Sequence, residues 1–188
     1  ALTRQGDIRS EIILKSFGIK KIYFYKNANF FERIKYLIKS LVILNKIQNT
    51  KDLVKVVVEK IDIGLTTYDT FIRYTRNPSQ KRLDYRMIVI FSEALYANDF
   101  FNRFYTKHKI SKLVQAEKQF VPLSIMFQKA LSKNISIYNR RGTDHPSVRI
   151  YNTLKSGYES SQNFSKKLFF EIYNKHNKKA LSIINPFI

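Results

Sequence analysis

The stretch Lys112–Gly142 constrains the fold most, because it carries a complete strand–helix–strand pattern. A short apolar run, Leu113–Glu117, ends in a carboxylate, and Pro122 follows where the first turn of a helix tolerates proline. Apolar residues then recur at helical spacing, namely Leu123, Met126, Phe127, Ala130 and Leu131. Ile135–Tyr138 alternates as a strand does. Strands joined by such a helix are parallel neighbours with a right-handed crossover, so the sequence predicts an α/β fold with a parallel sheet. We expect Leu123, Phe127 and Leu131 to be buried between this helix and the sheet.

The ends of these two predicted strands carry the first candidate site residues. Ligands of parallel sheets bind at the carboxyl ends of the strands, which here are Glu117 and the run Asn139–Gly142. Glu117 could act as a base toward a hydroxyl group, or it could be a solvated acid before a helix N-terminus. Arg140 and Arg141 could hold a phosphate through their guanidinium groups, or they could lie in an ordinary surface loop of a basic protein.

The rest of the chain alternates between helical and extended patterns. A short helix ends at Gly18, and Ile22–Tyr25 reads as a strand. The remaining predicted elements are a helix at Phe30–Lys46 with a capping box at Asn29 and Glu32, an ambiguous run Val54–Val58, a helical stretch Tyr68–Arg76, a long helix Gln80–Lys107, an extended or turn segment Arg149–Asn152, and a final amphipathic helix through Leu168 to about Lys179.

The helix Phe30–Lys46 is strongly amphipathic. Its apolar stripe consists of Ile34, Leu37, Ile38, Leu41 and Val42. Its lysines, Lys35, Lys39 and Lys46, could touch an anionic bilayer, but we favour a solvated outer face for them.

Composition excludes several classes of protein. Cysteine is absent, so disulfides and thiolate metal sites are excluded, and the three scattered histidines make no metal-ligand spacing. No apolar run approaches the roughly 20 residues of a membrane span, and the first residues lack the apolar core of a secretory signal. The 188 residues suit one α/β domain or half of a two-domain enzyme. Because residue 1 is not Met and the chain ends abruptly at Ile188, we expect a fragment whose partner domain is missing.

The formal net charge of +20 permits nucleic acid, an anionic membrane or phosphorylated ligands as partners. The lysines are spread over every segment, and Lys, Asn, Ile, Phe and Tyr are abundant together, as AT-rich codon usage produces. We therefore favour biased composition over dedicated nucleic-acid binding.

A third group of candidate residues brings a family resemblance. Tyr68, Asp69 and Arg73 share one helical stretch, where the plain interpretation is an ion pair between Asp69 and Arg73. Together with Ile63-Gly64 they resemble the conserved box Ile-Gly-acid-x-x-Tyr-Asp-Thr-x-x-Arg of bacterial surface-carbohydrate (capsule or O-antigen) biosynthesis proteins of the GT-B glycosyltransferase type. Leu65 stands where that family has an acid.

The resemblance extends from about Ser16 to Tyr151. In that family a long helix, a strand, a helix, a strand, a loop and an Arg-x-Tyr segment follow the box, and Arg149-Ile150-Tyr151 stands in the last place here. It implies that residues 1–188 form a single Rossmann-like domain, a parallel sheet flanked by helices. This domain would be the N-terminal, acceptor-side half of a GT-B protein, without the C-terminal half that binds the nucleotide-sugar donor.

The implied activity is glycosyl transfer in surface polysaccharide assembly, without a metal or another cofactor. Glu117 and Asp69 are then the catalytic candidates, and the substrate-binding candidates are Tyr68, Arg73, Arg140, Arg141 and Arg149. The acceptor would be a saccharide or a lipid-linked saccharide, met in the cytoplasm at the inner membrane, with peripheral membrane contact and no specific nucleic acid. Two alternatives stay open: a basic nucleic-acid-binding module that stacks bases on Tyr and Phe, and a non-catalytic interaction domain with a degenerate Rossmann core.

Overall fold

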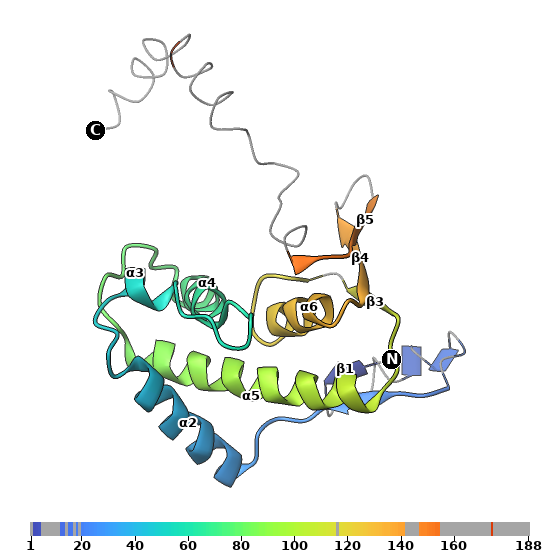
Figure 1. The fold of residues 1–188 in the computed structure, drawn as a ribbon, viewed down its shortest axis with the longest axis horizontal. Helices are drawn as coiled ribbons and strands as arrows, with labels where there is room; N and C mark the ends of the chain where they lie inside the picture. The colour runs from blue at the N-terminus through green and yellow to red at the C-terminus, as the bar shows by residue number, and fades with distance from the viewer. Residues whose placement is uncertain are drawn as a thin grey trace.

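The computed structural model describes residues 2–4, 12–13, 15–16, 18, 20–115, 117–141, 147–154 and 174. Figure 1 shows a mixed α/β arrangement with strands β1 (Leu2–Arg4), β2 (Tyr23–Tyr25), β3 (Lys112–Gln115), β4 (Ser136–Arg141) and β5 (Ser147–Tyr151), and helices α2 (Phe30–Leu44), α3 (Thr50–Leu53), α4 (Ile63–Thr75), α5 (Tyr85–Lys107) and α6 (Leu123–Ser132). The final helix predicted through Leu168 lies outside the described residues except at residue 174.

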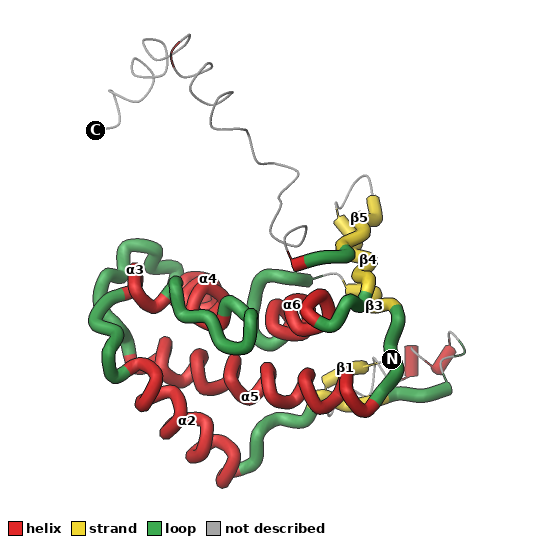
Figure 2. Tube along the Cα trace, in the orientation of Figure 1, coloured by secondary structure: helices red, strands yellow, loops and turns green. Residues whose placement is uncertain are grey.

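Helix α5 is the centre of the molecule. Figures 1 and 2 show it running through the fold, with α2 along one side and α4 and α6 along the other. Its buried residues include Met87, Phe91 and Phe101. The helix begins at Tyr85 and not near Gln80 as predicted, because the segment before it is tied to α3 and Asp84 caps the helix. Thr50 donates hydrogen bonds from its backbone N–H to the Lys81 carbonyl (3.0 Å) and from its hydroxyl to the Gln80 carbonyl (2.9 Å).

The predicted strand–helix–strand unit is confirmed. β3 and β4 pair in parallel, with Leu113 opposite Ile137, and α6 is the crossover helix between them. Phe127 and Leu131 are buried, as expected. Leu123 is 38% exposed, so its predicted burial is wrong. It is the first residue of α6 and therefore stands at the edge of the helix–sheet contact.

The three-stranded sheet is mixed, so the expectation of a wholly parallel sheet is correct only for β3 and β4. β5 runs antiparallel to β4, with Ile150 opposite Tyr138. Only residues 142–146 separate β4 from β5, and a parallel return would need a crossover of a dozen or more residues. α6 covers one face of the sheet, while Val114 and Val148 on the other face are 80% and 63% exposed.

The structure also corrects the orientation of α2. The predicted capping box is confirmed, because the Asn29 side chain accepts from Glu32 N–H while the Glu32 carboxylate accepts from Asn29 N–H. The face that packs on α5 contains Tyr36, Ser40 and Leu44. The lysines are exposed as expected, but so is the apolar stripe, with Leu41 49% and Val42 71% exposed.

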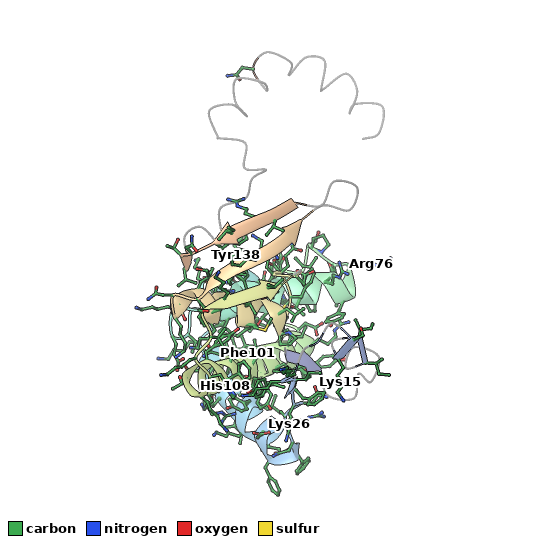
Figure 3. All side chains as sticks on the ribbon, turned by 90° about the vertical axis from the view of Figure 1, so that its right-hand side faces the viewer. Lys15, Lys26, Arg76, Phe101, His108 and Tyr138 are labelled. Atoms are coloured by element: carbon green, nitrogen blue, oxygen red, sulfur yellow. The ribbon has the colours of Figure 1, made fainter. Side chains whose placement is uncertain are left out.

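The N-terminal strand β2 agrees with the sequence prediction, and the ambiguous run before α4 is resolved as a turn. The strand predicted at Ile22–Tyr25 appears as β2, pairs in parallel with β1, and packs Tyr25 against Phe101 of α5 with ring centroids 5.4 Å apart. Figure 3 shows Phe101 in the interior of the molecule, below the sheet that carries Tyr138. The ambiguous run Val54–Val58 is mostly turn, with a single bridge between Val58 and Ile61.

Candidate functional site at the ends of the parallel strands

The strand register brings three polar side chains into one row across the sheet. Gln115 of β3 pairs with Asn139 of β4, which pairs with Arg149 of β5. Asn139 Nδ2 donates to the Gln115 carbonyl at 2.7 Å, and both residues are buried. We call Gln115, Asn139 and Arg149 the polar row. It lies at the carboxyl end of β3 and two residues before the end of β4, near the edge where ligands of parallel sheets bind.

Gln115 has a buried acceptor without a donor. Its Nε2 donates to the carbonyls of Glu117 and Leu123, the latter at 2.8 Å, and these two acceptors fix which end of the amide is nitrogen. Its Oε1 is buried and has no hydrogen-bond partner among the described residues. A buried acceptor left unpaired costs about 1–3 kcal/mol. A hydroxyl or amine from a ligand would remove this cost.

Arg149 has a buried donor without an acceptor. Its Nη1 is buried and has no partner within the described part of the chain. The Arg149 guanidinium lies over the Tyr151 ring at 5.2 Å, and Lys118 Nζ lies 4.8 Å from the centre of the same ring and 3.3 Å from its hydroxyl. Tyr151 is fully buried, so two cations converge on one desolvated ring. An anion bound beside them would pair with Arg149 and offset the repulsion between the two positive charges.

Glu117 shapes the loop that follows β3. Its Oε1 accepts hydrogen bonds from the backbone N–H groups of Lys118 and Gln119, each at 2.7 Å. The side chain is half-buried and stands several residues before α6, so it is neither fully solvated nor in the first turn of that helix.

The box that carries the family resemblance starts with a tight contact between α4 and α3. A Cβ on Gly64 would stand 1.8 Å from the Leu53 carbonyl oxygen, a distance that no side chain could occupy. Thr66 Oγ1 lies 3.1 Å from Ser124 Oγ and accepts from Gln128 Nε2 at 3.1 Å. These contacts fix α4 against α3 on one side and α6 on the other.

Further along α4, the box holds the segment between β3 and α6. Thr70 Oγ1 accepts from Val121 N–H at 3.0 Å, and the Arg73 guanidinium lies over the Phe120 ring at 4.9 Å. The Tyr68 hydroxyl turns the other way and donates to the Pro78 carbonyl at 2.8 Å. Arg73 therefore lies beside the loop that connects β3 to α6. The hydroxyl of Tyr68 instead supports the turn after α4.

Asp69 is the box residue whose carboxylate makes no hydrogen bond or ion pair within the described segments. The expected ion pair with Arg73 is not present there, because the guanidinium lies over Phe120. Asp69 is half-buried, and burial raises the pKa of its carboxyl group. A raised pKa makes this carboxylate a stronger base than an ordinary aspartate.

Arg140 and Arg141 lie at the end of β4, with backbones opposite Val148 and Ser147. Their side chains fall outside the described part of the structure. Their role in substrate binding therefore stays a prediction.

Sequence reasoning did not single out Gln115 or Lys118, and it placed Asn139 only as the first residue of the run that ends the second strand. A usable signal was present, because Gln115 follows Leu113 and Asn139 follows Ile137 at inward-facing positions of the strands. A polar residue at a position that alternation assigns to the core is a candidate for a buried polar contact.

A second polar cluster lies between α2 and α5, around a cavity of about 320 Å³. Glu59 has a left-handed backbone, with φ of 51°, and is paired with the buried Lys129 at 2.7 Å. The hydrogen bond from Lys129 lowers the pKa of Glu59. The Tyr36 hydroxyl donates to Asp99 at 2.6 Å, and burial together with this acid raises the pKa of Tyr36. No group of three or more His, Asp or Glu side chains that could hold a metal ion occurs within the described ranges.

Comparisons with known proteins assign no family. No protein-family model matches the sequence, and neither a curated protein nor a solved structure shows significant similarity to it.

Proposed function

We propose that the chain is the acceptor-binding, Rossmann-like half of a GT-B glycosyltransferase that acts in bacterial surface polysaccharide assembly. The parallel β3–α6–β4 unit supports this proposal, since it is the elementary unit of a Rossmann-like sheet. The box in α4 supports it too, because Thr70 and Arg73 contact the loop after β3.

The observation that carries the proposal is the pair of unpartnered buried atoms in the polar row. Gln115 Oε1 needs a donor and Arg149 Nη1 needs an acceptor. A sugar with a phosphate group supplies both, through its hydroxyl groups and its phosphate oxygens. Arg149 and Lys118 then hold the phosphate, and Gln115 accepts a hydroxyl hydrogen. The ligand class is accordingly a phosphate-bearing saccharide acceptor, including one linked to a lipid.

The reaction would transfer a glycosyl group from a nucleotide sugar held by a second half of the protein. An acceptor oxygen forms the bond to the anomeric carbon, the bond between that carbon and the nucleotide phosphate breaks, and the acceptor proton passes to a base. Asp69 suits this role better than Glu117, because burial raises its pKa and because Glu117 Oε1 already accepts two hydrogen bonds. Arg140 and Arg141 remain substrate-binding candidates beside the polar row.

A titration of this chain with inorganic pyrophosphate tests the proposed ligand class. Isothermal calorimetry should detect binding, and Arg149→Gln should weaken it about tenfold or more, because a charge-assisted hydrogen bond is worth about 1.5–3 kcal/mol. Lys109→Gln is the matched control, since it removes one positive charge from an exposed residue outside the polar row. Equal weakening by both variants, or no binding by the parent chain, would refute the proposal.

A further inference from the structure

Helix α2 presents a continuous apolar face to solvent. We call this face the outer stripe. Its members lie on one arc of the helix and are each between 37% and 79% exposed; they are Phe30, Phe31, Ile34, Leu37, Ile38, Leu41 and Val42. Single exposed apolar residues are ordinary on a protein surface, but a contiguous set of this size marks an interaction site.

The orientation of α2 is fixed by its polar face, so the stripe is not a misplaced core. The Tyr36 hydroxyl bonds Asp99 of α5 at 2.6 Å, and the small side chain of Ser40 is completely buried at the contact. The Asn29–Glu32 capping box defines where the helix begins. Figure 1 shows α2 at the outer side of α5, away from α6 and the three-stranded sheet. The stripe is therefore available to a partner without any unfolding.

The charges around the stripe decide which partner it fits. Lys35 and Lys39 are exposed and border the Val42 side of the stripe, and the exposed Arg33 borders its other side. Lys46 is exposed just beyond the end of α2. Lys39 also lies 3.7 Å from Asp99, across the contact with α5. The whole chain has a formal charge of +20. This cationic border would repel a second copy of the same chain and would attract a surface that carries negative charge.

We infer that α2 binds the surface of an anionic lipid bilayer. The outer stripe enters the boundary between headgroups and acyl chains, and the bordering Lys and Arg side chains meet lipid phosphates and carboxylates. The helix would lie along the membrane plane, since its 15 residues span about 22 Å. Among the described residues no helix is both long and apolar enough to cross a bilayer. This inference does not depend on the proposed glycosyl transfer.

Vesicle flotation with the intact chain tests the inference. Two vesicle types are compared: pure phosphatidylcholine, and phosphatidylcholine with about one third phosphatidylserine, at low and physiological salt. The test variant is Phe31→Glu with Leu41→Glu, two exposed positions of the outer stripe. The matched control is Val114→Glu with Val148→Glu, two exposed positions on the open face of the sheet. Circular dichroism and thermal unfolding verify that both variants keep the parent fold.

We expect the parent chain and the control to float with the anionic vesicles and the stripe variant to lose about tenfold in partitioning. Three results would overturn the inference. The parent chain could fail to bind anionic vesicles. The stripe variant and the control could bind equally, which would assign binding to net charge alone. Alternatively, size-exclusion chromatography could show a dimer that the stripe variant abolishes while vesicles bind neither protein, which would assign the stripe to a second copy.

Discussion

Gly64 is the residue whose identity the fold constrains most tightly. The other residues of the box make hydrogen bonds and a ring contact. At Gly64 the fold requires that there be no side chain, because α4 crosses α3 at the Leu53 carbonyl. A glycine just before the predicted helical stretch Tyr68–Arg76 is compatible with a turn, whereas the structure shows a helix–helix contact inside α4. Turn and close contact both favour glycine, so residue type alone could not distinguish them.

Gly64→Ala should therefore be strongly destabilising, by about 2 kcal/mol or more, since the added methyl group overlaps a backbone oxygen. The control is Gly18→Ala, where no atom lies within 4 Å and only the left-handed backbone (φ +75°) resists the change, at roughly 1–2 kcal/mol. Urea denaturation measures both. A Gly64→Ala variant as stable as the parent would show that α3 and α4 separate more easily than this contact indicates.

A second prediction at the residue scale concerns the buried Lys129, whose charge is met by Glu59. Glu59→Gln should destabilise the fold by about 1–3 kcal/mol, because it leaves a charged donor buried with weaker compensation. Lys129→Met should cost less, since an apolar side chain of similar length leaves no buried charge. Lys55→Gln, in an exposed pair with Asp52, is the control and should lie within about 1 kcal/mol of the parent. Equal effects of Glu59→Gln and Lys55→Gln would contradict the prediction.

At the scale of elements, periodicity identified the β3–α6–β4 unit and helix α2 but could not orient α2. The change from helical to alternating spacing near Asn134 fixed both element types and their parallel pairing. An apolar stripe, in contrast, indicates only that some surface covers the helix face, and it does not indicate which surface. On α2 the contact with α5 uses Tyr36, Ser40 and Leu44, and the Tyr36 hydroxyl donates to Asp99, so the buried face of the helix is not its apolar stripe.

Phe127→Ala tests the packing of α6 on the sheet. Phe127 is 3% exposed and meets Tyr151 edge to face, with ring centroids 5.2 Å apart. Truncation should cost about 3–5 kcal/mol in unfolding free energy. Val114→Ala, at an 80% exposed position of β3, should cost less than about 1 kcal/mol. Similar losses for the two variants in chemical denaturation would contradict the assignment of the covered and open faces.

The start of α5 gives a pH-dependent prediction. The Asp84 carboxylate accepts hydrogen bonds from the Arg86 side chain and backbone N–H, and these lower the pKa of Asp84 to about 2. Its pKa in the unfolded chain is about 3.9, so the contribution of Asp84 is complete above that pH and is lost as pH falls toward 2. Asp84→Ala should cost about 1 kcal/mol at neutral pH and progressively less in acid. A stability difference that does not change with pH would show that the charge of Asp84 has no role in capping.

At the scale of the whole molecule, the sequence predicted an α/β fold with a parallel sheet, and the structure confirms the α/β class and one parallel strand pair. The strand ends as the place for a site stay a prediction. The sequence did not predict the antiparallel β5, whose residues were expected to be extended or in a turn, or the polar row, which depends on the register of three strands. Asn139 meets Gln115 and Arg149 only after β4 is placed between its two neighbours. Strand register of this kind leaves no periodicity in the sequence.

The distribution of cations over the molecule predicts weak and non-specific binding to nucleic acid. Figure 3 shows Arg76 well away from Lys15 and Lys26, and no single element collects the positive charge. A filter-binding titration with DNA and RNA at physiological salt should give affinities of about micromolar or weaker. Nanomolar, sequence-dependent binding would instead favour a nucleic-acid-binding module.

The most direct test of the proposed acceptor site is a nuclear magnetic resonance titration of the labelled chain with inorganic pyrophosphate. The ligand should perturb the side-chain amide of Gln115 and the guanidinium of Arg149 first, together with the backbone of Lys118, because these groups surround the unpaired buried atoms. Resonances of exposed lysines elsewhere, such as Lys51 and Lys81, should shift little at the same concentration. Perturbations spread evenly over the exposed lysines, with Gln115 and Arg149 unchanged, would contradict the acceptor site.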